Sequence, residues 1–228
     1  MSERKNIGMI VAVEMSAVFE RYGQAKEVKE SGGFKLYIYE LEGYTLYLAH
    51  CGVGEIAAAA AAQELISKYG VQLIVNFGVV GGLTEDMAST RTCIVEKIVH
   101  YDMDLSECDP VPVGQYPGFD SIFLPATAEL VEKAVAIEPT LKKVICASAD
   151  KFVGAAEKKR ALNEKYGAEI CEMESAGIVL TCLRNNIPCI FIKTVADSIN
   201  GGAEEFYEAV RSTSAICLEI TEKIIKEI

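Results

Sequence analysis

Two acidic residues lie in apolar surroundings, where a carboxylate is tolerated only if it is paired, hydrogen-bonded or protonated. Glu174 falls in the stretch AEICEMESAGIVLTCL, whose apolar spacing predicts a helix, and Asp197 follows the apolar run CIFIKTVA. Both are therefore candidates for site chemistry. A structural alternative stays open for each residue: Glu174 as a hydrogen-bonded core carboxylate, and Asp197 as the N-cap of a helix.

Other candidates follow other predicted strands. Glu14 follows the first apolar run, the segment GVVGG begins at Gly78 after Phe77, and the segment 150–152 follows a run that contains Ile145. In open α/β sheets, ligands bind beyond the carboxyl ends of the strands. Convergence of these ends at one edge would bring the candidates together.

Each of these segments also has a structural alternative. GVVGG lets backbone amides approach a ligand, but it matches neither a P-loop nor G-x-G-x-x-G, and it could be a tight strand-to-helix turn. Phe152 could stack on a planar base or belong to the core. His100, followed by Tyr101 and Asp102, could belong to a metal or acid–base cluster or be a hydrogen-bonded structural histidine.

Short β-rich runs alternate with helical patterns along the chain. The predicted strands span 7–13, 35–40, 45–50, 73–77, 92–99, 144–149 and 189–195. The predicted helices span 15–22, 57–69, 126–137, 155–166, 172–184 and 203–226. This order predicts one α/β domain over residues 1–228, with a parallel or mixed sheet covered on both faces.

Composition excludes several classes of partner. A net charge of −11 argues against nucleic acid or an anionic membrane. No run approaches the roughly 20 apolar residues of a membrane span, and the first is too short for a signal peptide, so we expect a cytoplasmic protein. Eight cysteines without C-x-x-C spacing indicate reduced, buried thiols. Two histidines exclude a multi-histidine metal site, and we expect no cofactor.

The order and content of several segments resemble the nucleoside phosphorylase/nucleosidase superfamily, specifically the 5′-methylthioadenosine/S-adenosylhomocysteine nucleosidases. The matching stretches are IGMIVAVE, HCGVGEIAAAAAAQELI, LIVNFGVVGGL, HYDMDL, GQYPG, SADKFV, EMESAG and KTVADS, and they span nearly the whole chain. The resemblance implies a three-layer α/β sandwich with a mixed, partly barrel-like central sheet. It also implies a homodimer that cleaves the N-glycosidic bond of a purine nucleoside.

The resemblance also implies roles for the leaving-group half of a site. Asp197 would be the general acid that protonates N7 of the purine. Glu174 would bind the ribose hydroxyls, with Met173 packed under the sugar. Phe152 would stack on the base, and the backbone of Val153 would contact its Watson–Crick edge.

The nucleophile half departs from the family pattern. The nucleosidases have a water-activating glutamate where this chain has Ser16, so Glu14, two residues earlier, would have to replace it. Val79 stands where the family has a serine, which leaves Gly78 and Val79 as candidate contacts to substrate. Phosphorylases bind phosphate with arginines at the positions of Ser16 and Asn76.

Three functions follow from this pattern. Hydrolysis of a 5′-methylthioadenosine or S-adenosylhomocysteine type of substrate is favoured, because it needs no cationic phosphate site. A phosphorylase is the alternative if folding brings Arg21, Arg91 or Arg211 into the pocket. A nucleoside-binding protein without catalysis is the third.

The resemblance also implies that the segments around Asp104 and Pro117 lie near a dimer interface.

Overall fold

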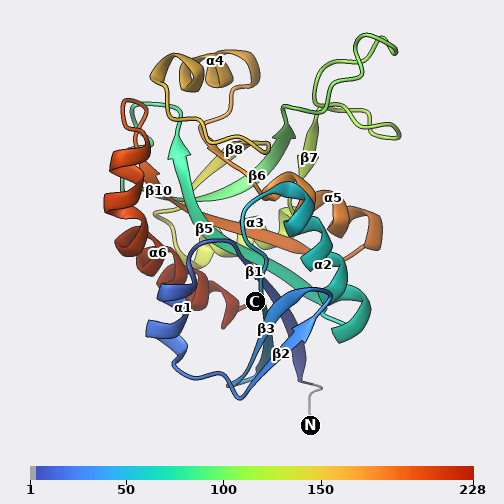
Figure 1. The fold of residues 1–228 in the computed structure, drawn as a ribbon, viewed down its shortest axis with the longest axis vertical. Helices are drawn as coiled ribbons and strands as arrows, with labels where there is room; N and C mark the ends of the chain where they lie inside the picture. Colours follow the sequence, from blue (N-terminus) through green and yellow to red (C-terminus); the bar gives the residue numbers. More distant parts are fainter. Residues whose placement is uncertain (1–3) are drawn as a thin grey trace.

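The computed structural model describes residues 4–228, and in this part of the chain ten strands form one sheet (Figure 1). The strands are β1 (Lys5–Val11), β2 (Glu27–Ser31), β3 (Phe34–Leu41), β4 (Tyr44–His50), β5 (Leu73–Gly82), β6 (Thr92–His100), β7 (Phe123–Pro125), β8 (Lys142–Ser148), β9 (Ile170–Glu172) and β10 (Cys189–Asp197). The helices are α1 (Met15–Tyr22), α2 (Glu55–Tyr69), α3 (Ala128–Ile137), α4 (Ala156–Tyr166), α5 (Ser175–Asn185) and α6 (Ala203–Ile225).

The centre of the sheet closes on itself. β10 pairs in parallel with β5 and antiparallel with β6, and the path from β6 returns to β5 through β8 and β9. These five strands therefore form a closed mixed barrel, in which every strand has a partner on each side. β1, β4, β3 and β2 extend outward from β5 in that order. The predicted mixed, partly barrel-like sheet is confirmed.

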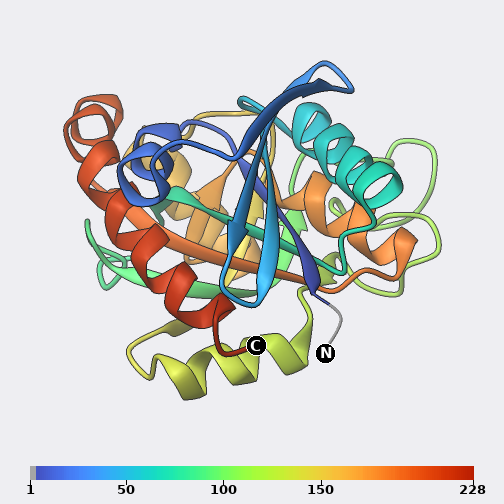
Figure 2. The ribbon, with the colours of Figure 1, turned by 90° about the horizontal axis from the view of Figure 1, so that it is seen from below.

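Helices cover the sheet on opposite sides. Figure 2 shows α1 and α6 on one flank and α2 and α5 on the other. α6 packs against β10 and β5, while α2 packs against α5, β1 and β4. The strands at the centre are consequently buried on both faces, and β10 is buried along its whole length. This explains why their sequences are continuous apolar runs.

Most predicted elements are confirmed within a few residues. The hairpin of β3 and β4 is antiparallel with Leu41 opposite Tyr44, and α2 ends at Gly70, whose left-handed φ of 57° suits a residue without a Cβ. β2 escaped prediction because its residues EVKES are mostly exposed and charged, as at the edge of a sheet.

Near the site, two of the structural alternatives are excluded and one predicted element was wrong. The GVVGG segment is not a turn, because β5 continues through Gly82. The predicted helix 172–184 is two elements, a short strand that ends at Glu172 and a helix that begins at Ser175, so Glu174 precedes the helix. Asp197 is the last residue of β10 and not a helix N-cap, since Gly202 holds that place before α6.

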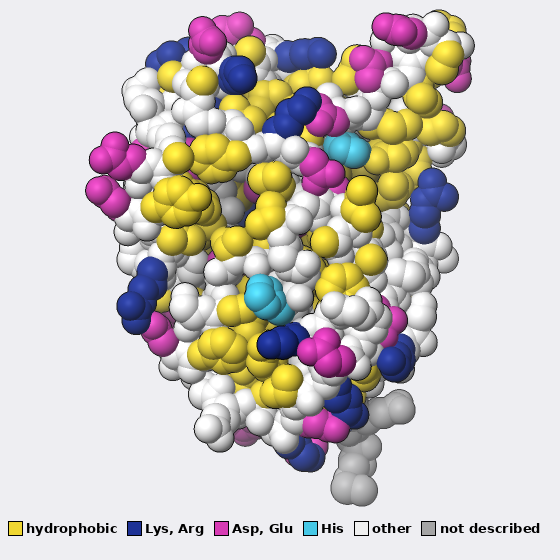
Figure 3. All heavy atoms as spheres, viewed as in Figure 1, with side chains coloured by type: hydrophobic (Ala, Val, Ile, Leu, Met, Phe, Trp, Pro, Cys, Tyr) yellow, Lys and Arg dark blue, Asp and Glu magenta, His cyan; other side chains and the backbone are white. Residues whose placement is uncertain are grey.

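Two surface properties of residues 4–228 bear on partners. No helix in this range is both long and apolar enough to cross a bilayer. On the face shown in Figure 3, Lys and Arg side chains are scattered among Asp and Glu and form no continuous basic surface.

Candidate active site

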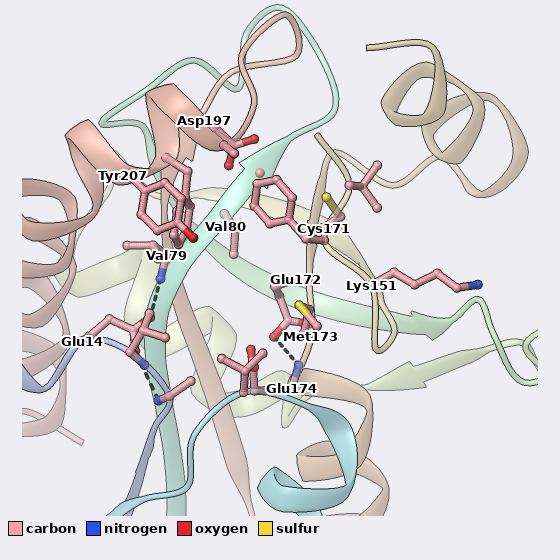
Figure 4. A pocket seen from close by; sticks show the side chains of 18 residues that line it. Glu14, Val79, Val80, Lys151, Cys171, Glu172, Met173, Glu174, Asp197 and Tyr207 are labelled. Atoms are coloured by element: carbon pink, nitrogen blue, oxygen red, sulfur yellow. Dashed lines mark hydrogen bonds between the residues drawn. The ribbon is translucent and has the colours of Figure 1, made fainter. Parts of the chain in front are cut away.

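A cavity of about 340 Å³ lies where β1, β5, β9 and β10 end. Figure 4 shows Asp197 at one end of this cavity, and Glu14 and Glu174 at the other. The remaining lining is mostly apolar. The lining residues are Ala12, Val13, Glu14, Val53, Val79, Val80, Gly81, Lys151, Phe152, Val153, Cys171, Glu172, Met173, Glu174, Asp197, Ala203, Phe206 and Tyr207.

Asp197 is placed by an irregularity in β10. The pairing with β5 shifts register between Val195 and Asp197, and such a bulge changes the direction of the side chain that follows it. The carboxyl is 1% exposed, and its Oδ2 accepts a hydrogen bond from Lys159 Nζ at 2.5 Å. Burial raises the pKa of Asp197, while the hydrogen bond and charge of Lys159 act in the opposite direction. Asp197 can thus hold a proton and give it up.

Glu174 occupies the N-cap position of α5. Its Oε1 accepts a hydrogen bond from the backbone N–H of Gly54 at 3.0 Å. Burial and then the nearby charge of Glu172 raise the pKa of Glu174 to about 8. The carboxyl group can therefore both donate and accept hydrogen bonds, as contact with a pair of sugar hydroxyls requires.

Glu172 positions the backbone at Glu174. It accepts hydrogen bonds from the backbone N–H groups of Glu174 at 3.1 Å and Ser175 at 2.9 Å, and it pairs with buried Lys193 at 3.1 Å. Although burial opposes ionisation, Lys193 and the hydroxyls of Ser148 and Ser175 hold the pKa of Glu172 below its usual range. Glu172 is a fixed anion that orients the start of α5.

Glu55 and Glu172 share the hydroxyl of Ser148. Ser148 Oγ contacts the carboxyl groups of both residues and accepts the backbone N–H of Ala176 at 3.1 Å. A hydroxyl has one proton to donate, so one of the two carboxyl groups must donate to it. Burial and the charge of Glu172 raise the pKa of Glu55 to about 8, which identifies Glu55 as the protonated partner at neutral pH.

Backbone groups hold Glu14 at the end of the cavity opposite Asp197. Its Oε2 accepts hydrogen bonds from the N–H groups of Ala12 at 3.2 Å and Val13 at 2.9 Å, and its Oε1 accepts that of Val79 at 3.0 Å. The side chain is 4% exposed and lines the cavity (Figure 4). Gly78 does not line the cavity. It leaves room for the carboxylate, because a Cβ there would lie 2.7 Å from Glu14 Oε1.

The residues predicted to contact the base and sugar also meet here. Phe152, Val153, Met173 and Val79 all line the cavity. Phe152 is 50% exposed and is therefore not a core residue. Its ring meets that of Phe206 edge to face, with centroids 5.7 Å apart.

Several alternative candidates lie elsewhere. Ser16 is exposed on α1, and Asn76 donates to the carbonyl of Ile10. Arg21 pairs with Glu222 and Arg211 with Glu20; neither they nor Arg91 lines the cavity.

His100 hydrogen-bonds Tyr116 at 2.7 Å, as a structural histidine would. Within the described residues, no group of three potential ligands could hold a metal ion.

Sequence patterns missed two of the supporting residues. Glu172 is part of the same E-M-E motif as Glu174, and this motif could have revealed it. Lys159 gave no signal, because it is one of six charged residues in the helix AEKKRALNEKY. Its complete burial depends on the loop after β10, which is distant in sequence.

The cavity combines an acid at one end with carboxyl groups at the other. Lys151 is the only cation among the described residues that line it, and its ammonium is bound to Asp102 at 2.7 Å. This arrangement can protonate a leaving group, orient hydroxyls and accept a proton from water. It offers no cluster of cations for an anionic nucleophile.

Comparison with known proteins agrees with this geometry. The chain is 28% identical over 221 residues to the aminodeoxyfutalosine nucleosidase of Helicobacter pylori, covering 92% of this chain and 95% of that protein. It is 27% identical over 217 residues to the 5′-methylthioadenosine/S-adenosylhomocysteine nucleosidase of Staphylococcus aureus, covering 92% and 94%.

Solved structures give the same picture of the fold. A 5′-methylthioadenosine/S-adenosylhomocysteine nucleosidase of H. pylori, solved in complex with a pyrrolopyrimidine compound, superposes with a TM-score of 0.94 at 24% identity over 100% of both chains. The Neisseria meningitidis enzyme bound to methylthio-immucillin-A gives 0.89 at 25% identity, covering 98% and 100%. The phosphorylase superfamily model matches residues 7–228. This chain belongs to the phosphorylase superfamily.

Proposed function

We propose that the protein is a nucleosidase that hydrolyses the N-glycosidic bond of a purine nucleoside. The observation that carries the proposal is the position of Glu14. Its carboxylate is fixed by three backbone N–H groups at the end of the cavity opposite Asp197, although the sequence has no glutamate at the family's usual position. In this proposal, Glu14 takes the role of that glutamate from a position two residues earlier.

Each carboxyl group has a distinct task in this reaction. Asp197 donates its proton to N7 of the purine, and the electron pair of the breaking C–N bond passes to the base. Positive charge develops on the ribose, and Glu174 favours it through the hydroxyls that it binds. Glu14 accepts a proton from water as the water oxygen bonds to the anomeric carbon.

The charges in the cavity favour water over phosphate. Glu14 would repel an anionic nucleophile, and Lys151, the single lining cation of the described residues, is already paired with Asp102. A water molecule carries no charge and benefits from a neighbouring base. Hydrolysis is thus the better match to this site than phosphorolysis.

The substrate that we propose is an adenine nucleoside with an extended 5′ substituent. 5′-Methylthioadenosine, S-adenosylhomocysteine and aminodeoxyfutalosine are the substrates named for the relatives. Phe206 and Tyr207 of α6 line the same cavity as Val79 and Glu14. These rings offer an apolar surface for a 5′ group.

The test is release of free base from these three nucleosides, with adenosine and inosine for comparison, with and without inorganic phosphate. Release that is independent of phosphate, with ribose carrying its 5′ group as the second product, is expected. A strict requirement for phosphate, with a sugar 1-phosphate as product, would instead establish a phosphorylase. Tight binding without turnover of any nucleoside would refute catalysis.

A homodimer in the cytoplasm completes the proposal. Val53 lines the cavity and is 52% exposed. Ile56, in the first turn of α2, is 81% exposed. In Figure 3, apolar side chains gather below the projecting loop that precedes β7. A second copy would bury such a surface. Sedimentation equilibrium should give twice the mass of one chain.

The cysteines support the cytoplasmic location. All eight are free thiols, as a reducing compartment would keep them.

A further inference from the structure

A lysine is buried against the acid at the base end of the cavity. Lys159 lies on α4, a helix of mostly exposed charged residues, yet its side chain is 0% exposed. Its Nζ donates to Asp197 Oδ2 and to the Ser198 carbonyl at 2.5 Å each. The carbonyl oxygens of Gly201 and Asp197 lie at 3.4 and 3.5 Å. All four neighbours are acceptors, which suits an ammonium with three N–H donors.

Stability alone does not explain this arrangement. Removing an ammonium from water is costly, and buried ion pairs are often no more stabilising than apolar side chains of the same volume. The preceding residue, Lys158, is exposed, so α4 can leave a lysine in solvent. A charge retained in the interior beside a reactive carboxyl points to a role in the reaction.

Lys159 also decides which oxygen of Asp197 is available. It binds Oδ2, and within residues 4–228 no other side chain donates to this carboxyl group. Asp197 lines the cavity, so Oδ1 is left to meet a ligand. The carbonyls that Lys159 binds belong to residues 197–201, and its bonds therefore also fix the chain between β10 and α6.

Three titratable groups face Asp197 from the elements around it. Lys159 of α4 favours the ionised carboxylate. Glu205 of α6 disfavours it and holds the same loop from the other side, because its Oε2 accepts the N–H and the hydroxyl of Ser198 at 2.9 Å each. Cys171 of β9 lines the cavity nearby as a neutral thiol, since burial raises its pKa to about 12.

We infer that Lys159 is a positioning residue for the general acid: it holds Oδ2 so that Oδ1 points to the leaving base, and it stabilises the carboxylate that remains after proton transfer. This inference rests on the proposed role of Asp197. The proton leaves Oδ1 for N7 of the purine, and the resulting negative charge forms next to the ammonium. Because that charge grows only as the reaction proceeds, Lys159 stabilises the transition state more than the bound substrate.

Replacing Lys159 by methionine removes the charge and keeps an unbranched side chain. We expect kcat to fall on the order of tenfold or more, with a smaller change in KM. The basic limb of the kcat–pH profile should move to higher pH, because a carboxyl without its cationic neighbour retains its proton longer. Lys158→Met makes the same change on the exposed face of α4. It should match the wild type in kcat, in KM and in the position of the basic limb of the kcat–pH profile.

Two further variants separate positioning from folding. Lys159→Arg keeps the charge, so its basic limb should stay near that of the wild type. In an Asp197→Asn background, Lys159→Met should cost little further activity, because the carboxylate that it serves is absent. Circular dichroism establishes that each variant is folded; if Lys159→Met is not, Lys159→Gln replaces it under the same criteria.

The outcomes distinguish this inference from the proposed function. Absence of turnover in the wild type would overturn the function, and wild-type turnover in Asp197→Asn would overturn the role of Asp197 as the general acid. If Asp197→Asn is inactive but the folded Lys159→Met variant keeps the wild-type kcat and basic limb, only the inference is overturned. If Lys159→Met lowers kcat but leaves the basic limb of the kcat–pH profile where it is in the wild type, the inference is also refuted, because a purely structural role gives that result.

Discussion

The role proposed for Asp197 belongs to the scale of a single residue, because one buried carboxyl group would supply the proton for the leaving base. We expect Asp197→Asn to lower kcat by about 10²–10⁴, the usual contribution of a general acid, with KM near the wild-type value. Asparagine keeps the size of the side chain but cannot give up a proton. Steady-state kinetics with the best nucleoside measure the effect.

The matched control is Asp109→Asn, which makes the same change on the exposed loop before β7 and should leave both constants unaltered. If Asp197→Asn weakened binding as much as turnover, Asp197 would be a contact residue and not an acid.

At the scale of one element, β5 shapes the nucleophile end of the cavity. Its residue Gly78 lies against Glu14, and a Cβ there would approach Oε1 to 2.7 Å. Gly78→Ala should therefore displace the carboxylate and lower kcat by roughly tenfold or more, since misplacement by about 1 Å is costly in catalysis. The variant should keep the fold, because the flexible end of the glutamate can move.

The background variant Glu14→Gln provides the control for this prediction. If Gly78→Ala acts through the base, it should cost little additional activity when the base is already absent. Equal losses in the wild-type and Glu14→Gln backgrounds would show that Gly78 acts in another way.

For the whole molecule, the buried carboxyl groups link stability to pH. The pKa of Glu55 is about 8 in the folded protein, against an ordinary value of 4.5. The folded state thus holds a proton that the unfolded chain releases between these values, so the free energy of unfolding falls as pH rises through this window. Glu174 acts in the same direction, and Glu172, whose pKa is lowered, acts in the opposite one.

Glu55→Gln should flatten this decline, because glutamine has no proton to lose. Each pKa unit of difference corresponds to about 1.4 kcal/mol, so the change in slope is measurable by urea unfolding at several pH values. Glu42→Gln, in the exposed turn between β3 and β4, is the control that should keep the wild-type slope. An unchanged slope in Glu55→Gln would contradict the protonated state of Glu55.

The fold was predictable because most strands and helices carry strong local patterns, such as the apolar run of β10 and the left-handed Gly70 after α2. The boundaries at the site were not. Glu174 lies where a strand gives way to a helix within three residues, and the local sequence is apolar on both sides. β5 continues through its glycines because β10 and β9 pair with them, a long-range effect.

The same limit applies to the site residues. Family resemblance indicated Asp197, Glu174 and Phe152, all of which line the cavity. It could not decide whether Glu14 replaces the missing glutamate, because that depends on the direction of a side chain after β1. The role of Lys159 could not be predicted, because its partner Asp197 is 38 residues away in the sequence.

The manner in which Glu14 is held affects how this site can evolve. Its three donors are main-chain N–H groups of Ala12, Val13 and Val79, and every amino acid except proline supplies such a group. Side chains at positions 13 and 79 can therefore diverge without releasing the Glu14 carboxylate. Mutational drift at these cavity-lining positions can change which nucleosides fit, while the chemistry at the anomeric carbon is inherited intact.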